Sequence, residues 1–330
     1  MRIGYYPGCS LHATSREFDE SLRATAAALE VELAEIDDWS CCGATSGHAT
    51  NHLLSVALPA RNLALAEEQG LQEVLAPCAA CYNRLASASY SLREDAGLEM
   101  KIKGILARPF ANTVRVRNVM ELYRALIPQI TEKSAGRLKG MKVACYYGCL
   151  LVRPPGVLAF DDAEQPTSMD EICRATGATT VDWNLKVECC GGAFSLSRTA
   201  SVIRLGRAIL KDARRAGAEA LIVACPMCHS NLDFRQGAMT QSGETPMPVL
   251  FLSELVGMGL GLPAPDLGME RHFVNTGPIL KRAGETAAQV AAEATAKAAK
   301  AAETGAKITA QTEAATMSQS GVPPAGKGVA

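Results

Sequence analysis

The sequence predicts an α/β protein with two pseudo-repeated domains, each with a short, mostly parallel sheet and packed helices, followed by a disordered C-terminal tail. Three observations lead to this prediction. The cysteines recur in two sets of nearly equal spacing, short apolar runs alternate with helical periodicity in both halves, and the composition changes near residue 285. Strands that alternate with helices are typical of a parallel sheet covered by helices. We therefore expect domains at residues 1–135 and 136–278 and an Ala-rich flexible tail at 279–330.

The repeat is visible both in the cysteine spacing and in the residues around it. The first set reads C-x31-CC-x35-C-x2-C and the second reads C-x39-CC-x34-C-x2-C. YYPGCS in the first half corresponds to YYGCLL in the second, and EEQGLQEVLAPCAACYNRL corresponds to RRAGAEALIVACPMCHSNL. Agreement at this many offsets indicates an internal duplication. The first set is Cys9, Cys41, Cys42, Cys78 and Cys81, and the second is Cys149, Cys189, Cys190, Cys225 and Cys228.

Each half is expected to run from a strand that ends at a cysteine, through a long helix, a loop carrying CCG and a second helix, to a strand that ends in C-x-x-C. EVLAPC and ALIVAC are short apolar runs bounded by turn signals, as expected of buried parallel strands. Gly70 and Gly217 precede the C-x-x-C by eight residues and can end the second helix of each half. The buried stripe of that helix in the later half comprises Val202, Leu205, Ile209 and Ala213. Ligands collect at the carboxyl ends of parallel strands, where the cysteines would lie.

Composition and charge exclude several classes of function. The net charge is −1, which removes the general electrostatic argument for nucleic acid or an anionic membrane as partner. No signal peptide is recognisable, and no apolar run approaches the roughly 18 residues needed to span a bilayer, so no transmembrane segment is expected. We expect a cytoplasmic protein. Twelve cysteines in a reducing compartment favour metal ligation or redox catalysis over structural disulfides.

The segment from about residue 285 is rich in Ala, Lys, Glu and Thr and has almost no large apolar side chain. Alanine favours helix, so part of the segment could form a solvated helix, but the segment cannot bury a core. We interpret it as a flexible tail that cluster assembly does not require, with a helix that docks on a partner as the alternative.

The number of cysteines in each set discriminates among metal groups. Neighbouring side chains on an extended backbone point to opposite sides, so a Cys-Cys pair is a poor clamp for one small ion unless the chain turns sharply. Structural zinc takes four ligands, and a cubane [4Fe-4S] cluster takes four thiolates, so a fifth cysteine is surplus to either group. A four-ligand site with one uninvolved cysteine and a disulfide between Cys41 and Cys42 are the alternatives, but the surplus occurs in both sets.

The doubled pattern resembles the cysteine-rich CCG-domain proteins, and the arrangement as a whole resembles the B-subunit family of heterodisulfide reductase. YYPGCS, CCG, PCAACYNRL, YYGCLLVRP, ECCGG and CPMCHSNL carry the resemblance, which extends from residue 1 to about residue 275. In that family each domain holds a noncubane [4Fe-4S] cluster that uses five cysteines, one of them bridging. The resemblance implies two such clusters here, bound by the first and second cysteine sets defined above. Glycine directly after each pair, at Gly43, Gly191 and Gly192, would permit the tight turn.

The resemblance also implies the reaction and the partners. Two clusters that face a common cleft would cleave an organic disulfide reductively, or form one in the reverse direction, with one electron from each cluster. Electrons would come from a C-subunit-like protein with two cubane [4Fe-4S] clusters and a flavin-containing A-subunit-like protein. The chain itself has no ferredoxin-type cysteine run and no convincing dinucleotide-binding glycine motif, which agrees with an external electron donor.

Two other functions are compatible with the cysteine pattern. The chain could relay electrons as a CCG subunit of an iron–sulfur dehydrogenase, although such proteins usually carry the ferredoxin motif on the same chain. It could also be a non-enzymatic scaffold of a redox complex, with zinc in one of its sites. Iron and acid-labile sulfide would separate these classes from zinc without sulfide.

Several further residues are candidates for lesser roles. Cys145 on an expected strand and Cys173 on an expected helix are interpreted as small buried apolar residues. His48 and His229 follow the cysteine motifs and could assist catalysis by shaping a substrate pocket or donating a proton, with a structural role as the alternative. The basic candidates for an anionic substrate, or for simple surface solvation, are Lys142 and Arg153.

Overall fold

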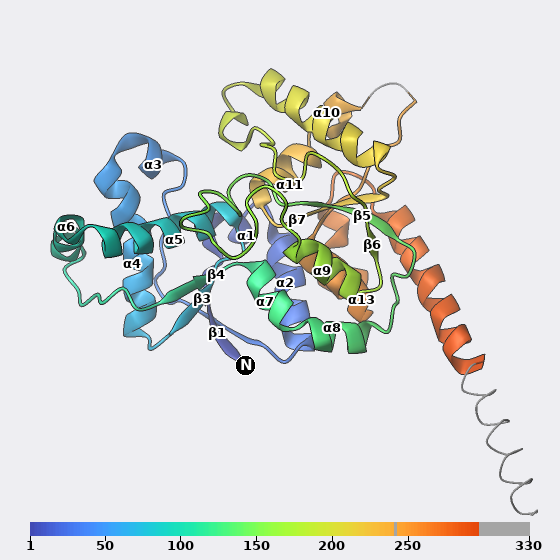
Figure 1. Ribbon diagram of the computed structural model, residues 1–330, viewed down its shortest axis with the longest axis horizontal. Helices are drawn as coiled ribbons and strands as arrows, with labels where there is room; N and C mark the ends of the chain where they lie inside the picture. Colours follow the sequence, from blue (N-terminus) through green and yellow to red (C-terminus); the bar gives the residue numbers. More distant parts are fainter. Residues whose placement is uncertain (241–242, 297–330) are drawn as a thin grey trace, which may run out of the picture.

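The computed structural model describes residues 1–240 and 243–296, and it contains two parallel sheets of four strands each (Figure 1). The first sheet has the strand order β2-β1-β3-β4 and the second has the order β6-β5-β7-β8. All pairings are parallel, and the two orders match position by position. The predicted α/β duplication is therefore confirmed. The strands are β1 (Arg2–Tyr5), β2 (Glu32–Glu35), β3 (Glu73–Leu75), β4 (Arg115–Arg117), β5 (Lys142–Tyr146), β6 (Thr179–Thr180), β7 (Ala220–Val223) and β8 (Val249–Phe251).

The two central strands of each sheet are the ones that the sequence predicts, whereas the outer strands are additional. β1 and β3 lie at the centre of the first sheet and carry the apolar residues of its core. The outer strands β2, β4 and β6 read ELAE, RVR and TT, and they are too short and too polar to show an apolar pattern. Each half therefore has four strands where periodicity indicates two.

Helices flank both sheets. The first half has α1 (Gly8–His12), α2 (Arg16–Ala28), α3 (Ser46–Thr50), α4 (His52–Glu68), α5 (Ala79–Glu94), α6 (Ala96–Leu106), α7 (Val119–Ala125) and α8 (Ile127–Ser134). The second half has α9 (Ser168–Ala175), α10 (Thr199–Arg215), α11 (Pro226–Leu232), α12 (Gln236–Met239) and α13 (Leu252–Leu260), with short 3-10 helices η1 (Gly192–Phe194), η2 (Ala264–Leu267) and η3 (Met269–Arg271). Gly70 and Gly217 follow α4 and α10 with φ of +70° and +82°, as predicted for residues that end a helix.

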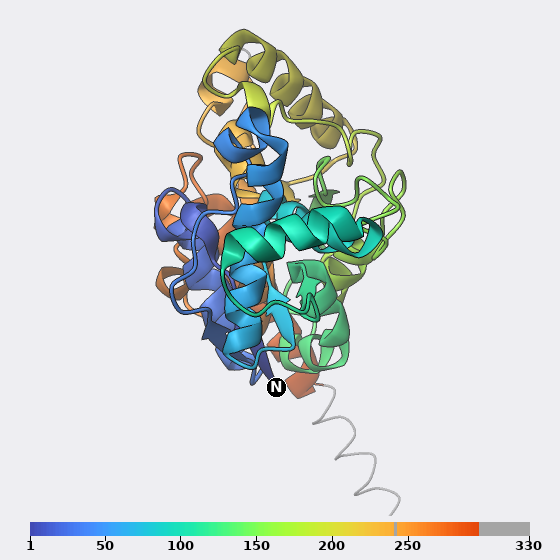
Figure 2. The same ribbon diagram turned by 90° about the vertical axis from the view of Figure 1, so that its left-hand side faces the viewer.

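The two halves share one continuous apolar core. Helix α13 of the second half packs against α2 of the first half and against α8. The rings of Phe18 and Phe251 stack with their centroids 4.2 Å apart, and the hydroxyl oxygens of Ser21 and Ser253 lie 2.6 Å apart in a buried hydrogen bond. Viewed from the side, α10 lies at the end of the molecule opposite the N-terminus (Figure 2). The seam between the halves is therefore a packed interface.

A helix follows the second half at residues 277–296 and extends away from the body (Figure 1). Its first turns are anchored, because Ile279 is buried in the core and Arg282 forms an ion pair with Glu219 at 2.5 Å. Packed structure thus continues past residue 278, since Ile279 supplies an apolar contact and the alanines that follow favour helix. The prediction of a flexible tail also covers residues 297–330, which lie outside the described residues.

Candidate functional site

The cysteines of each set lie around the carboxyl ends of the two central strands, where a parallel sheet presents its ligand-binding edge. In the first half, Cys9 follows β1 within α1, the Cys41–Cys42 pair follows β2, and Cys78 and Cys81 lie at the start of α5 after β3. In the second half, Cys149 follows β5, the pair at 189–190 follows β6, and the C-x-x-C at 225–228 opens α11 after β7. Cysteines as far apart in sequence as Cys149 and Cys228, which are 79 residues apart, meet at one edge for this reason.

The sulfur contacts are the same in both halves. Cys42 Sγ lies 3.5 Å from Cys81 Sγ, and Cys190 Sγ lies 3.4 Å from Cys228 Sγ. The backbone N–H of Gly43 donates to Cys41 Sγ at 3.4 Å, and the N–H of Gly191 donates to Cys189 Sγ at 3.3 Å. The first cysteine of each pair is thus held by its own turn, while the second turns inward to the C-x-x-C. This turn is what allows two adjacent side chains to serve one site.

Glycines allow the backbone to approach these sulfurs closely. Gly43 and Gly191 have φ of +71° and +81°, so the turn expected after each Cys-Cys pair is present. Gly8 has φ of +68°, and a Cβ atom there would lie 2.9 Å from Cys81 Sγ. Gly148 has φ of +64°, and its Cβ would lie 3.2 Å from Cys228 Sγ. A side chain at either position would therefore occupy the space of a cysteine sulfur.

One buried tyrosine in each half connects the Cys-Cys loop to the end of the central strand, β1 or β5. The Tyr6 hydroxyl donates to the Ser40 carbonyl oxygen at 2.7 Å, and the Tyr146 hydroxyl donates to the Glu188 carbonyl oxygen at 2.6 Å. Burial raises the pKa of both phenols well above the usual value, and the neighbouring cysteines raise it further. Sequence reasoning missed this role, although both tyrosines belong to the quoted YYPGC and YYGC motifs.

The two cysteine groups adjoin at the seam between the halves. Cys78 and Cys225 are neighbours there, and the Cys225 thiol is the main cause that lowers the pKa of Cys78 well below its usual value. Both residues are buried, whereas Cys9, Cys41 and Cys189 are exposed. Each site therefore has an inner end that faces the other site and an outer end that faces solvent.

The two sites differ in charge. Arg84 is half-buried beside the first site, where its guanidinium helps to lower the pKa of Cys42 after the larger effects of the Cys41 and Cys81 thiols. The same position of the repeat in the second half is Asn231, whose side-chain N–H donates to Cys190 Sγ at 3.6 Å. A cation in one half is thus replaced by a neutral amide in the other.

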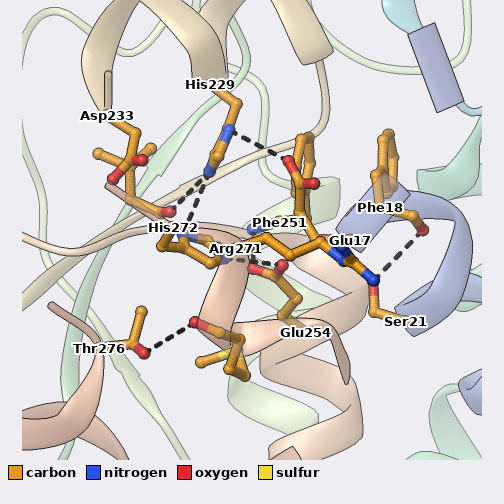
Figure 3. Close-up of polar contacts among 12 residues, drawn as sticks. Glu17, Phe18, Ser21, His229, Asp233, Phe251, Glu254, Arg271, His272 and Thr276 are labelled. Carbon is orange, nitrogen blue, oxygen red and sulfur yellow. Dashed lines mark hydrogen bonds and ion pairs between the residues drawn. The ribbon is translucent and has the colours of Figure 1, made fainter. Parts of the chain in front are cut away.

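The two candidate histidines lie in different surroundings. His48 is exposed on α3 and its Nδ1 is 2.9 Å from the Arg84 guanidinium, so it lies at the outer side of the first site. His229 is buried in the seam, where its ring stacks on Phe251 with centroids 4.4 Å apart (Figure 3). Burial lowers the pKa of His229 well below its usual value. A catalytic role for either residue stays a prediction.

The remaining candidate residues have local partners. Cys145 on β5 and Cys173 on α9 are fully buried, with their sulfurs 3.6 Å apart, as expected of packed apolar residues. Lys142 is exposed at the start of β5, the end opposite the cysteines. Arg153 forms an ion pair with Glu164 at 2.9 Å.

The family model for the cysteine-rich domain, CCG, matches this chain twice, at residues 3–86 and 143–233. The two matches cover more than half of the chain and coincide with the two cysteine sets. The protein therefore belongs to the CCG cysteine-rich domain family. Within it, the chain is homologous to the B subunits of heterodisulfide reductases, as the individual relatives show.

Two relatives align with nearly their whole length. The chain is 32% identical to the 8-methylmenaquinol:fumarate reductase membrane anchor subunit of Wolinella succinogenes, over 83% of this chain and 97% of the relative. It is 29% identical to the B subunit of the ferredoxin/F(420)H(2)-dependent CoB-CoM heterodisulfide reductase of Methanosarcina acetivorans, over 87% of this chain and 98% of the relative. Both relatives are subunits of reductases, which makes this chain a homologue of redox subunits.

A solved structure has the same fold. The crystal structure of a hypothetical protein from Helicobacter pylori aligns with a TM-score of 0.63 at 13% identity, over 83% of this chain. The chain spans about half the length of that protein, 52%. In the described residues, none of the helices has the length and apolar character needed to cross a membrane.

Proposed function

We propose that the ten cysteines of the two sets hold two noncubane [4Fe-4S] clusters, one in each half. The donor set fits such a group, because each site offers five thiols, an N–H···S hydrogen bond from the CCG turn, and a glycine whose missing Cβ leaves room beside a sulfur. When bound, the clusters would supply one-electron transfer. The protein's own part is to hold the thiols in place through the Tyr6 and Tyr146 hydrogen bonds and to keep the inner cysteines away from water.

The spread of the sulfurs supports a multi-iron group over a single zinc ion. Four thiolates around zinc, at about 2.3 Å from the metal, would lie roughly 3.8 Å from one another. Among the described residues, no three cysteine sulfurs all lie within 4.8 Å of one another. The ligand-type atoms that do lie this close belong to His229, Asp233 and His272. The cysteine sulfurs follow one another in an extended row, in which Cys81 neighbours both Cys42 and Cys78, and a row of this kind suits a group with several metal atoms.

The function that the geometry supports best is reduction of an organic disulfide, or its formation in reverse, by the catalytic subunit of a heterodisulfide reductase-like complex. Cleavage of one S–S bond consumes two electrons and two protons and yields two thiols. The observation that carries this proposal is that Cys78 and Cys225, the buried cysteines at the inner ends of the two sets, are neighbours, which brings two one-electron sites together. The exposed outer cysteines allow electrons to enter from partner proteins.

The proposed partners are a C-subunit-like protein with two cubane [4Fe-4S] clusters and a flavin-containing A-subunit-like protein. The relative from Methanosarcina acetivorans supports such a complex, because its name makes it one subunit of a larger reductase. The proposed location is the cytoplasm. Association with the membrane fraction of cells, together with a quinol-linked partner, would contradict that location.

A second candidate is electron relay in a complex like 8-methylmenaquinol:fumarate reductase. The 32% identity to the Wolinella succinogenes protein over 97% of its length favours it. In that case single electrons would pass from one cysteine site to the other and on to a partner protein, and no disulfide would bind.

One anaerobic preparation tests these functions. Iron and acid-labile sulfide at about eight of each per chain would support two [4Fe-4S] clusters, whereas zinc without sulfide would favour a scaffold. The reduced protein is then mixed with a panel of organic disulfides, and oxidation is followed by absorbance and electron paramagnetic resonance. Stoichiometric release of two thiols supports disulfide reduction. Oxidation by a menaquinone analogue alone, with every disulfide inert, would reject it in favour of relay.

A further inference from the structure

A second group of ligand-type side chains lies in the seam between the halves, apart from the cysteines (Figure 3). His229 belongs to α11, Asp233 follows that helix, and His272 follows η3. One ligand atom from each of the three lies within 4.8 Å of the other two. His229 and Asp233 are buried, and the side chain of His272 is 1% exposed. Three groups that bind divalent cations are thus gathered at one point.

The distances between the groups match those around a metal ion. His229 Nε2 and His272 Nδ1 lie 3.3 Å apart. Two imidazole nitrogens bound to one tetrahedral zinc ion at about 2.0–2.1 Å would be separated by roughly 3.3–3.4 Å. A cation could therefore take its place between these two nitrogens with little movement of either ring.

The outer nitrogen of each histidine faces a carboxylate. His272 Nε2 lies 2.9 Å from Glu254 Oε1, and His229 Nδ1 lies 3.7 Å from Glu17 Oε1. Metal-bound histidines almost always donate their other N–H to a carboxylate or carbonyl, which fixes the ring and leaves the inner nitrogen with a free lone pair. His272 has this arrangement with Glu254 of α13, whereas the Nδ1 of His229 faces Glu17 of α2 at a distance too long for a direct hydrogen bond.

The Asp233 carboxylate is held in position by the backbone. Its Oδ2 accepts the Phe273 N–H at 2.7 Å and its Oδ1 accepts the Val274 N–H at 3.2 Å. Each carboxylate oxygen can accept more than one interaction, so a metal bond remains available. The segment that carries His272 is thereby fixed against α11.

The charge of the surroundings favours a cation. Glu17, Asp233 and Glu254 are 5%, 2% and 0% exposed, so three carboxylates are removed from water in one small region. Arg271, the nearby guanidinium, forms its ion pair with Glu20 at 2.9 Å on the outside. Buried charges in proteins are normally paired or coordinate a metal.

The group is also accessible. A cavity of about 630 Å³ is lined by Glu17, His229 and Asp233 together with Arg271 and Phe273. An ion can enter through this cavity, and water there can complete its coordination shell.

We propose that His229 Nε2, His272 Nδ1 and a carboxylate oxygen of Asp233 form a mononuclear site for a divalent transition cation such as Zn²⁺ or Fe²⁺. Imidazole ligands select these ions over Mg²⁺ and Ca²⁺, which prefer oxygen. The site joins α11 to the segment after η3 and, through Glu17, to α2 of the other half. It therefore clamps the seam next to the second cysteine set, and it does not depend on which group the cysteines bind.

The competing arrangement is a hydrogen-bonded network without metal. His229 Nε2 is also 3.1 Å from the Val249 carbonyl oxygen, so it could donate there and to His272. In that arrangement added metal ions would change neither the stability nor the metal content of the protein.

The experiment uses the full chain with its cysteine-bound metal in place. The protein is treated with a mild chelator, incubated with Zn²⁺ and desalted, and zinc, iron and sulfide are measured by mass spectrometry and colorimetry. We expect the wild type to retain one zinc ion more than His272→Gln and Asp233→Asn, with equal iron and sulfide in all three. His52→Gln, which changes an exposed histidine on α4, should retain as much zinc as the wild type.

Thermal unfolding with and without Zn²⁺ provides a second measurement, which the wild type can fail by itself. Zn²⁺ should raise the unfolding temperature of the chelator-treated wild type and of His52→Gln, and the rise should be absent in His272→Gln. X-ray absorption at the zinc edge should show nitrogen and oxygen ligands. No gain in zinc and no rise in unfolding temperature for the wild type would overturn the proposal, and so would a zinc shell of sulfur alone. Loss of iron from every variant would contradict the proposed clusters of the cysteine sites, and the zinc measurement on the wild type would still decide the present proposal.

Discussion

Replacement of Gly8 by alanine should damage the first cysteine site, and Gly70 offers a matched control. Gly8 has φ of +68° and Gly70 has φ of +70°, so the backbone strain of an alanine is nearly the same at both. That strain costs about 1–2 kcal/mol for an L-residue in the left-handed region. At Gly70 nothing lies within 4 Å of the added Cβ, whereas at Gly8 the Cβ would lie 2.9 Å from Cys81 Sγ.

The contact at Gly8 is shorter than the roughly 3.5–4.0 Å at which non-bonded heavy atoms attract. The sulfur would have to move by several tenths of an ångström. A metal–sulfur bond of about 2.3 Å does not tolerate a displacement of that size, because ligand distances vary by only about 0.2 Å. We therefore expect Gly70→Ala to lower the free energy of unfolding by about 1–2 kcal/mol and to keep all of its iron. Gly8→Ala should show the same loss of stability and, in addition, loss of the metal of one site.

The assays are iron and acid-labile sulfide per chain, the electron paramagnetic resonance spectrum, and urea unfolding of both variants. Gly148→Ala repeats the test in the second half, where the Cβ would lie 3.2 Å from Cys228 Sγ, and a weaker effect is expected because the contact is longer. If Gly8→Ala and Gly70→Ala retain the same iron and the same spectrum, the close approach of the backbone to the sulfur is unimportant and the reasoning fails.

Three further predictions address the cysteines, the charge and the end of the chain. Cys42→Ala should remove or alter one cluster and abolish disulfide cleavage, while Cys145→Ala should keep the iron and cost no more than roughly 1 kcal/mol of stability; the opposite result in iron and sulfide assays would mean that the ligand set is wrong. Arg84→Asn, which reproduces the residue of the second half, should lower the reduction potential of one cluster by tens of millivolts, since 1 kcal/mol corresponds to roughly 40 mV per electron; unchanged potentials in a redox titration would rule out this electrostatic role. A chain that ends at residue 296 should retain its full iron content, and its loss from a folded, truncated protein would show that the last residues take part in assembly.

The sequence by itself determined the fold class, the duplication and the glycine-assisted turns, because these depend on local features. Cysteine spacing, strand-length apolar runs and the CCG turn are each contained in a short stretch of chain. Positive φ at Gly43, Gly70 and Gly217 was likewise predictable, since glycine adopts this conformation without a steric cost. The ligand assignment of the ten cysteines remains a prediction, which the grouping of the sulfurs supports.

Tertiary structure alone decided how the two halves meet. The proximity of Cys78 to Cys225, the stacking of Phe18 on Phe251 and the gathering of His229 with His272 join residues that no local pattern connects. The short polar strands β2, β4 and β6 exist because β1 and β5 and their neighbours offer hydrogen-bonding partners, not because their own sequences favour extended structure. Packing of α13 against α2 brings these groups together, since burial of the apolar faces of both halves is possible only when they share one core.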